Sequence, residues 1–585
     1  MGEFTVGTKP PGAREFTPRA VVVGMLVAVV MGASYPYVVL KLGFGPNVSV
    51  VAAFLGFLGL AFVGLFTGRS NRWENNIVQT AGTSAAQTAF MCVLLAAFDL
   101  LSPATRATFS FELTLWKSFA WLTAAGFLGV LLAVPMRQHF VVDEKLTYAD
   151  GVAAAETVIL LDSQGRGSRG SVWALVFGTI ASAFVMFFQQ GYVGSFVIPD
   201  PVLTSATWLF GSYAVTMGMG VSTSLLSLGS GMIVGTRITV SMVIGTFISW
   251  TIAPHYLIDV YHILAKPSRN DVLRWVMWPA TGMLVTAGLT ALGLRWRILL
   301  KTFKNLTGDS IRTNEFPLRW VAIGAALSSV ALIVVQKWAL DLPIWMTAVA
   351  IVLSVPLMLV GLRVLGETNW GPISALSNMM QGLFAFIAPG HVGANMIASG
   401  TCGTVAADSQ AIMQDYKAGH IIGSSPRHMT YAQLMAVPIG ALAVSYMYPV
   451  LRGAYGIGGE HGLTSPISAK WAGFAEFLSG GFKALPPGAT TALIVAAILG
   501  VVLTVLEQRS KWVPSPTAVG IAMLVPGATV VTMLIGGLAD LVWRRGNPRQ
   551  ADAYSIPLAS GLIAGEAILA VILALLSAVG VVPGK

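Results

Sequence analysis

The sequence predicts an all-α polytopic membrane protein, because long charge-free apolar segments recur along a chain that also contains an internal repeat. Of the 585 residues, 55% are hydrophobic and only 10% are charged, whereas roughly a quarter of the residues of a soluble chain are charged. A helix needs about 20 apolar residues to cross the hydrocarbon of a bilayer. Residues 20–40, 42–68 and 75–98 contain no Asp, Glu, Lys or Arg. These and similar gaps predict about 16 membrane segments, re-entrant hairpins included.

The internal repeat is visible in two pairs of segments that keep the same order. Ser224–Trp250 aligns without a gap with Ser515–Leu541 at a spacing of 515 − 224 = 291, and residues 82–88 align with residues 403–409 at a spacing of 321. Small apolar residues recur by chance in any membrane protein, but ordered matches favour duplication. Many transporters consist of two related halves that meet at the substrate site.

The repeat and the basic residues predict four parts of the chain. Between the halves lies a Lys- and Arg-rich stretch followed by one apolar segment, which is typical of a cytoplasmic loop and a linking span. If each half has an even number of spans, one extra crossing inverts the second half relative to the first. The predicted parts are a cytoplasmic tail at 1–16, a first membrane repeat at 17–294, the loop and linking span at 295–341 and a second membrane repeat at 342–585.

Composition also excludes several classes of site. The net charge of +10 comes from short basic loops between apolar segments, so it indicates membrane orientation and no nucleic-acid partner. Cys92 and Cys402 are the only cysteines, too few for a disulfide framework or a structural zinc site. The sequence has no His-Glu-x-x-His motif, nucleophile elbow or phosphate-binding loop, which argues against an enzyme and against ATP-driven transport. We expect no metal site and no cofactor other than a coupling proton.

A polar stripe in the first half is the strongest candidate for substrate binding. Asn75, Gln79 and Thr83 recur at i, i+4 and i+8 and therefore share one helical face, and we add Gln87 to this set. The stripe suits hydrogen bonding to a polar solute. Its alternatives are a helix cap beginning near Glu74 or polar contacts between helices.

The matching region of the second half carries a carboxylate. Asp408 stands where the first half has Gln87, an arrangement suited to a proton or cation site, and we assign the nearby Gln410 to substrate binding. Asp415, close to Lys417, is interpreted as a solvated ion pair at the membrane interface.

Two further candidates are single charged residues. Glu156 follows a small-residue stretch that predicts a short re-entrant helix beginning near Thr147 and Asp150. In a dry cavity such a carboxyl would suit proton coupling, although a loop position is equally compatible. Arg237 lies within the repeat and suits binding of a substrate carboxylate or neutralisation of Glu156; its alternative is a span end that reaches water.

The last candidates lie near helix-breaking residues and a close helix contact. Glu367 and Asn369 precede Gly371-Pro372, whose first-half counterpart is Gly45-Pro46, and broken helices at matching positions indicate a transport site. We assign Asn369 to the substrate and Glu367 to proton coupling. Glu566 follows a Gly-xxx-Gly pair that permits close helix approach and is the fourth proton-coupling candidate, after Asp408, Glu156 and Glu367.

Six motifs are spread over nearly the whole chain. They are Glu74–Thr80 (ENNIVQT), Leu146–Ala153 (LTYADGVA), Val234–Arg237 (VGTR), Gly366–Ser374 (GETNWGPIS), Gln414–Gly419 (QDYKAG) and Ala559–Glu566 (ASGLIAGE). With these motifs, which occur in family order, the chain resembles the oligopeptide transporter family, as a bacterial member related to its yellow-stripe-like branch, which moves metal–chelator complexes.

The resemblance implies a fold of about 16 membrane segments and proton-driven uptake of small peptides or peptide-like metal chelates. From the residues we expect a secondary transporter that works by alternating access, with a passive channel or facilitator as the alternative and an intramembrane enzyme as a more remote one. We expect a multi-pass protein of the cytoplasmic (inner) membrane with the lipid bilayer as its surroundings. A homodimer is compatible with the sequence. The transported solute, the coupling ion and the direction of transport are left open.

Overall fold

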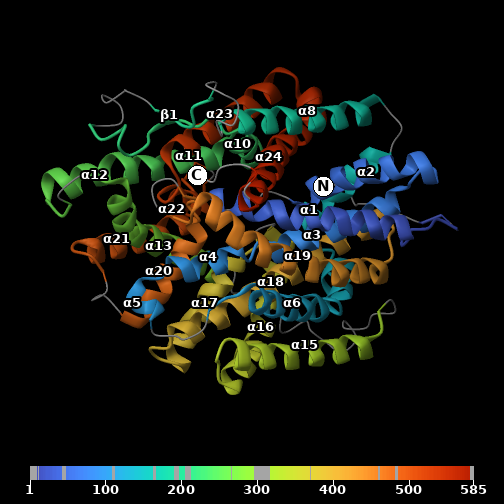
Figure 1. Ribbon diagram of the computed structural model, residues 1–585, viewed down its shortest axis with the longest axis horizontal. Coiled ribbons are helices and arrows are strands. Elements are labelled where there is room, and N and C mark those ends of the chain that lie inside the picture. The colour runs from blue at the N-terminus through green and yellow to red at the C-terminus, as the bar shows by residue number, and fades with distance from the viewer. Residues whose placement is uncertain are drawn as a thin grey trace.

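The computed structural model of the chain is helical and places its helices side by side in one bundle (Figure 1). In the described part, twelve helices are long and apolar enough to cross a membrane, and two shorter apolar helices accompany them. This confirms the all-α polytopic fold, while the number of about 16 segments stays a prediction. The structure describes residues 9–581 except 11, 43–47, 108–111, 163–165, 190–196, 204–211, 265–266, 295–315, 369–370, 459–461, 481–484, 511 and 580.

The first half begins with long helices, continues through several short helical segments and ends with one long helix. Its elements are α1 (Pro18–Leu42), α2 (Val48–Thr67), α3 (Arg72–Ala89), α4 (Cys92–Leu100), α5 (Pro103–Arg106), α6 (Leu115–Ala133), the π-helical turn η1 (Gln138–Asp143), α7 (Ala149–Asp162), α8 (Arg166–Gln189), the antiparallel strand pair β1 (Val202–Leu203) and β2 (Gly220–Val221), α10 (Leu225–Val234), α11 (Thr236–Phe247), η2 (Ile248–Ile252), α12 (Ala253–His255), η3 (Tyr256–Val260) and α13 (Arg269–Gly293).

A linking helix and a second half follow. The linking helix α15 (Leu318–Ala339) agrees with the predicted extra crossing, and the basic loop before it lies outside the described residues up to position 315. The second half contains α16 (Ile344–Thr368), α17 (Ile373–Ile387), α18 (Val392–Ile422), α19 (Pro426–Tyr455), α20 (Pro466–Gly480), α21 (Ala489–Glu507), α22 (Pro516–Ala522), α23 (Gly527–Gly546) and α24 (Pro548–Ala578).

The predicted repeat has the same helix boundaries in both halves. Helices α10 and α22 start 516 − 225 = 291 residues apart, and α11 and α23 start 527 − 236 = 291 residues apart. Each pair is interrupted between its two helices, at Gly235 in the first half and at residues 523–526 in the second. The pair α3–α4 likewise spans residues 72–100, which a shift of 321 places on 393–421, almost the whole of α18.

Contacts between the halves are reciprocal, as a pseudo-twofold axis requires. A Cβ atom built on Gly245 would lie 2.1 Å from the carbonyl oxygen of Val519, and one built on Gly536 would lie 2.1 Å from the carbonyl oxygen of Leu228. The two contacts are equivalent under the repeat spacing of 291. Gly245 of the first half corresponds to Gly536 of the second (245 + 291 = 536), and Val519 of the second half corresponds to Leu228 of the first (519 − 291 = 228). The two halves therefore pack on each other through equivalent surfaces.

The equivalent helices α11 and α23 run antiparallel. A Cβ built on Gly537 would lie 3.0 Å from Oγ1 of Thr239, and one built on Gly527 would lie 3.3 Å from Cγ2 of Thr246. The earlier residue of α11, Thr239, contacts the later residue of α23, Gly537, and Thr246 contacts Gly527, so the two helices run in opposite directions. For helices that cross a membrane, this relation corresponds to inverted repeats with an axis in the membrane plane.

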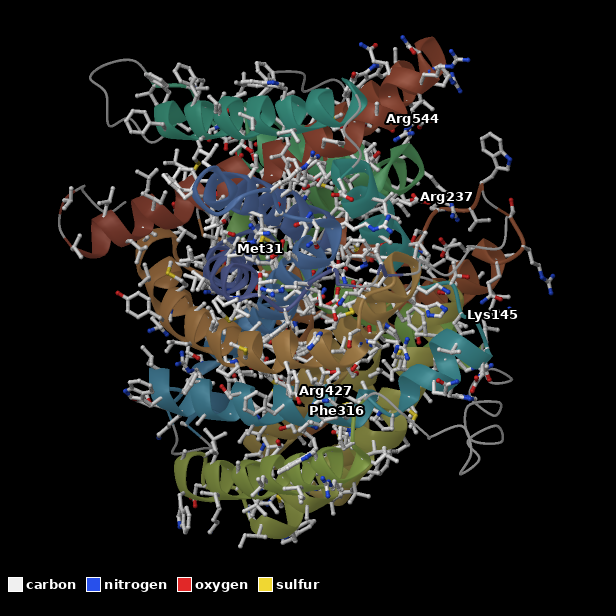
Figure 2. The ribbon with its side chains drawn as sticks, turned by 90° about the vertical axis from the view of Figure 1, so that its right-hand side faces the viewer. Met31, Lys145, Arg237, Phe316, Arg427 and Arg544 are labelled. Carbon is white, nitrogen blue, oxygen red and sulfur yellow. The ribbon has the colours of Figure 1, made fainter. Side chains whose placement is uncertain are left out.

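Helix α18 lies at the centre of the bundle. Every one of its 31 residues except His420 is buried, and it packs against α3, α6, α7, α16 and α17. Two views place α8 and α15 on opposite sides of the molecule, far from this centre (Figures 1 and 2). The exposed apolar side chains of α15, including Ile323, Leu327 and Val330, fit a helix that faces lipid.

Candidate functional site

The centre of the molecule is the crossing of α3–α4 with α18. Gln79 lies against Asp415, Thr88 against Asp408, and Leu94 against Gly400. The contacts run in opposite directions along the two helices, so these equivalent helices also cross antiparallel. The crossing point falls near Gln87 and Asp408, the two positions that the sequence repeat aligns.

Asp408 is fully buried at this crossing and only partly satisfied. Oγ1 of Thr88 donates a hydrogen bond of 2.7 Å to Oδ1 of Asp408, whereas Oδ2 has no partner among the described residues. Gly126 of α6 leaves room for this oxygen, because a Cβ built there would lie 2.9 Å from it. A buried carboxylate without a cation or a full set of donors is costly. Its setting fits a group that holds a proton in part of a cycle.

Asp415 repeats this arrangement two turns further along α18. It is 1% exposed, and Nε2 of Gln79 donates a hydrogen bond of 2.7 Å to Oδ1 of Asp415 while its Oδ2 has no partner among the described residues. The interpretation of Asp415 as a solvated pair with Lys417 is therefore wrong. Side chains two positions apart on a helix point in different directions, and that of Asp415 points inward to α3.

The bond between Gln79 and Asp415 predicts a measurable coupling. We expect Gln79→Leu to lower the free energy of unfolding by about 1–3 kcal/mol, because the buried carboxylate loses its donor. Leucine at both positions should recover part of the loss, since no buried carboxylate remains. Thermal unfolding of the purified protein in detergent measures both effects.

The chain contains a matched control for this pair. Gln138 donates a similar hydrogen bond of 2.9 Å to Asp143, but at an exposed position. We expect Gln138→Leu to change stability by no more than about 0.5 kcal/mol. Equal losses for Gln79→Leu and Gln138→Leu would contradict a special role of the buried pair.

The other residues of the predicted polar stripe differ in their surroundings: Thr83 and Asn75 lie against α2, and Gln87 is half-buried. Thr83 accepts a hydrogen bond of 2.9 Å from Nε2 of Gln79 and donates to Ser49 of α2, so the face shared by Gln79 and Thr83 is confirmed. Asn75 is buried against α2, where a Cβ built on Gly56 would lie 2.6 Å from its Oδ1. Gln87 is half-buried. The helix start is capped by a reciprocal Asn71–Glu74 box, which is the structural alternative for Glu74.

Gln410 lies on the other side of α18. It is buried, and a Cβ built on Gly371 would lie 2.7 Å from its Oε1. Its Nε2 has no partner among the described residues. It therefore faces the break between α16 and α17, where the sequence predicts a transport site. Asn369 lies outside the described residues, as does the side chain of Glu367.

Glu566 differs from the acids of α18 because its carboxylate is fully occupied. Nζ of Lys41 lies 2.7 Å from Oε1, the hydroxyl of Ser224 contacts both oxygens at 2.9 Å, and the backbone N–H of Leu226 donates to Oε2 at 2.9 Å. The ion pair ties α1 and α24 to the start of α10. These contacts favour a fixed anchor, while a role in proton coupling stays a prediction.

Removing one partner of this anchor should destabilise the protein. We expect Glu566→Gln to cost about 3 kcal/mol, because the ammonium of Lys41 would remain largely buried without its counterion. Glu507→Gln is the matched control, since the Glu507–Arg237 pair is more exposed and should contribute no more than about 1 kcal/mol. Thermal unfolding in detergent compares the two, and similar losses would contradict the assignment.

Arg237 and Glu156 are not brought together. Nη2 of Arg237 lies 3.0 Å from Oε1 of Glu507 and the arginine side chain is 44% exposed, so the proposed neutralisation of Glu156 is wrong. The pair lines a cavity of about 670 Å³ between α11, α13, α21 and α22, and Figure 2 shows Arg237 near one edge of the molecule. The short helix α7 begins at Ala149 as expected, but the side chain of Glu156 is exposed and not enclosed in a dry cavity.

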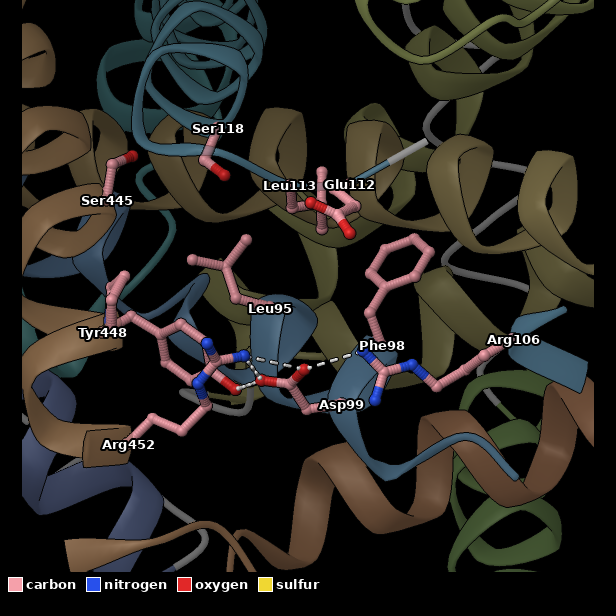
Figure 3. A pocket seen from close by; sticks show the side chains of 11 residues that line it. Leu95, Phe98, Asp99, Arg106, Glu112, Leu113, Ser118, Ser445, Tyr448 and Arg452 are labelled. Atoms are coloured by element: carbon pink, nitrogen blue, oxygen red, sulfur yellow. Dashed lines mark hydrogen bonds and ion pairs between the residues drawn. The ribbon is translucent and has the colours of Figure 1, made fainter. Parts of the chain in front are cut away.

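A second cavity opens beside the end of α4. Asp99 accepts hydrogen bonds from Arg452 at 2.8 Å and from the hydroxyl of Tyr448 at 2.5 Å, and Arg106 approaches it at 3.4 Å (Figure 3). The cavity of about 430 Å³ is lined in addition by Glu112 and several hydroxyl groups. Its charged groups are partly exposed, which suits an entrance more than an enclosed binding site.

Sequence reasoning missed Thr88, Lys41 and Lys470 as polar partners inside the bundle. Thr88 continues the stripe only after a break in its i, i+4 spacing, so its proximity to Asp408 had no local signal. Lys41 and Lys470 were detectable, because a basic residue next to or within an apolar segment is itself a signal.

The comparisons with known proteins cover almost the whole chain. Residues 15–577 match the family model "OPT oligopeptide transporter protein". The metal-nicotianamine transporter YSL2 of Arabidopsis thaliana is 25% identical over 97% of this chain and 94% of the relative. A probable metal-nicotianamine transporter of Oryza sativa, YSL8, is 25% identical over 98% and 92%. A putative oligopeptide transporter of Saccharomyces cerevisiae is 23% identical over 77% and 79%.

These matches confirm the resemblance drawn from the motifs and favour transport over catalysis. The family model covers the described helices from before α1 to the last turn of α24. The chain is therefore a multi-pass membrane transporter that belongs to the OPT oligopeptide transporter family.

Proposed function

We propose that the protein is a proton-coupled symporter that carries small peptides or peptide-like metal chelates across its membrane by alternating access. The class of substrate is supported by the relatives, which include a metal-nicotianamine transporter of Arabidopsis thaliana and a putative oligopeptide transporter of yeast. The cytoplasmic membrane is the location we expect.

The observation that supports proton coupling best is the pair of unneutralised carboxylates at the centre. Asp408 and Asp415 are buried where the two halves cross, and neither forms a salt bridge within the described part of the chain. Ionisable groups inside a membrane protein mark proton or ion pathways by default. We assign the coupled proton to these two acids, with Gln79 and Thr83 as neighbouring polar groups for the substrate.

The pseudo-twofold arrangement supports alternating access. The inverted elements pack reciprocally around the crossing of α3–α4 and α18, and rocking of one repeat against the other around a fixed central site is a common mechanism for such folds. A passive channel would instead need a continuous pore.

Uptake into liposomes tests the proposal. Purified protein is reconstituted and supplied with a mixture of di- to hexapeptides and ferric chelates, with and without an inward proton gradient, and the contents are measured by mass spectrometry. Accumulation of one class above the external concentration only with the gradient is expected. Equilibration that ignores the gradient would show a facilitator, and exclusion of all substrates would contradict the proposed function.

A further inference from the structure

The first turn of α17 brings a buried ammonium next to a hydroxyl group. Lys470 of α20 is only 6% exposed and donates a short hydrogen bond to Oγ of Ser374, which also accepts a bond of 3.0 Å from Nε1 of Trp471. No carboxylate pairs with Lys470 in the part of the chain that the structure describes. This side chain therefore has no counterion among the described residues.

The same place contains a buried amide whose donor has no partner among the described residues. Gln410 is 4% exposed, and a Cβ built on Gly371, just before α17, would lie 2.7 Å from its Oε1. A Cβ built on Gly361 of α16 would lie 2.9 Å from Nε2, which has no partner among the described residues. Helix α17 packs against α18 and α20 here (Figure 1), so the amide and the ammonium approach the start of one helix from two neighbours.

The helix itself adds positive potential. The residue before α17 is Pro372, which provides no side-chain cap, so the first backbone N–H groups of α17 point out of the helix without a capping side chain. The N-terminal end of a helix carries a partial positive charge and attracts anions. An ammonium, a primary amide and a helix N-terminus thus favour the same kind of ligand.

We propose that Lys470, with Ser374 and Gln410, binds a carboxylate group of the transported substrate. This assignment rests on the proposed function and adds the chemical group that the site recognises. One lysine with neutral donors balances a single negative charge, which fits a carboxylate such as a peptide C-terminus. A substrate carboxylate would supply a counterion to Lys470, which has none among the described residues.

The acids of the centre lie on a different side of α18. Asp408 and Asp415 face α3, whereas Gln410 faces α16 and α17. Proton binding and carboxylate binding are therefore assigned to separate faces of one helix, and a substitution at Lys470 should leave the response to the proton gradient intact.

The test compares pairs of probes with and without a carboxylate. Uptake of trialanine and of its C-terminal amide is measured in liposomes with an inward proton gradient, and the binding of both is measured by the thermal shift of the detergent-purified protein. Ferric citrate and a carboxylate-free ferric hydroxamate form a second pair. The variants are Lys470→Gln, Lys470→Arg and Ser374→Ala, with Lys337→Gln on the exposed side of α15 as the control.

We expect the wild type to prefer the carboxylate member of the transported pair. Lys470→Gln should lower uptake and binding of that member about 10- to 100-fold with little effect on the carboxylate-free member. Lys470→Arg should retain part of the preference because it keeps the charge, Ser374→Ala should reduce it less, and Lys337→Gln should match the wild type.

Other outcomes would overturn the assignment and can be separated from failure of the proposed function. A wild type that transports both members equally, or a Lys470→Gln variant that keeps the preference, would remove Lys470 as the carboxylate site while peptide or chelate symport stands. Equal loss of both members in Lys470→Gln and Ser374→Ala would show a structural role. A wild type that transports neither the four probes nor any member of the mixture of di- to hexapeptides and ferric chelates would contradict the proposed function itself.

Discussion

Replacing Asp408 by Asn is expected to abolish accumulation of substrate against its concentration. The amide has nearly the same shape, and its oxygen can still accept the hydrogen bond from Thr88 that Asp408 accepts at 2.7 Å. It cannot bind and release a proton near neutral pH. Without that step the proton gradient is no longer coupled to substrate movement, so the ratio of the internal to the external substrate concentration should fall to about one.

The measurement is uptake into liposomes at several imposed proton gradients, together with exchange of labelled substrate at zero gradient. Exchange should persist in Asp408→Asn, because the amide resembles the protonated carboxyl in shape and in lack of charge. Asp341→Asn is the matched control: Asp341 is exposed and has a positive φ of 52°, a conformation that Asn tolerates. Gradient-driven accumulation by Asp408→Asn, with loss in Asp415→Asn, would place the proton on Asp415 alone.

The repeat and the fold class could be predicted because their signal is local. The length of an apolar segment predicts a membrane span. The segments Ser224–Trp250 and Ser515–Leu541, which repeat at a spacing of 291 residues, contain the glycines that let the two halves approach each other. Equivalent packing requires small residues at equivalent positions, such as Gly245 and Gly536, so a duplication can be recognised in the sequence. The antiparallel relation of α11 and α23 is not in that pattern; it follows only from the contacts across the halves.

The site was predictable in its residue types and less so in its pairings. The stripe correctly placed Gln79 and Thr83 on one helical face, whereas the hydrogen bond between Thr88 and Asp408 was missed. The partner of Asp415 was missed, because its carboxylate contacts a residue 336 positions away. Local charge neighbours were a poor guide, since adjacent residues on a helix face different environments.

The same limit explains Arg237. A lone basic residue inside an apolar repeat has the same sequence signature whether it binds substrate or ends a span near water. Only the position of Glu507, which lies 3.0 Å away and 270 positions later, distinguishes the two. Burial, more than charge, separates Arg237 from Lys470: the first is exposed and paired, and the second is buried without an acid in the described residues.

Alanine at Gly245 or Gly536 is expected to prevent correct packing of the two halves. A Cβ at either position would lie 2.1 Å from a carbonyl oxygen of the opposite half, that of Val519 or that of Leu228. Backbone atoms cannot move aside as a flexible side chain can, so the helices must separate. We expect a loss of about 3 kcal/mol or more in the free energy of unfolding for each variant, and therefore little folded protein after purification.

The two substitutions also test the symmetry itself, because equivalent contacts should give similar losses. Gly382 within α17 is the control: a Cβ built there has no atom within 4 Å, and alanine should stabilise the helix by up to about 1 kcal/mol. Thermal unfolding and size-exclusion chromatography of the three variants provide the comparison. If Gly245→Ala were tolerated while Gly536→Ala unfolded the protein, the halves would not meet through equivalent surfaces, and alternating access based on an exchange of their roles would lose its structural basis.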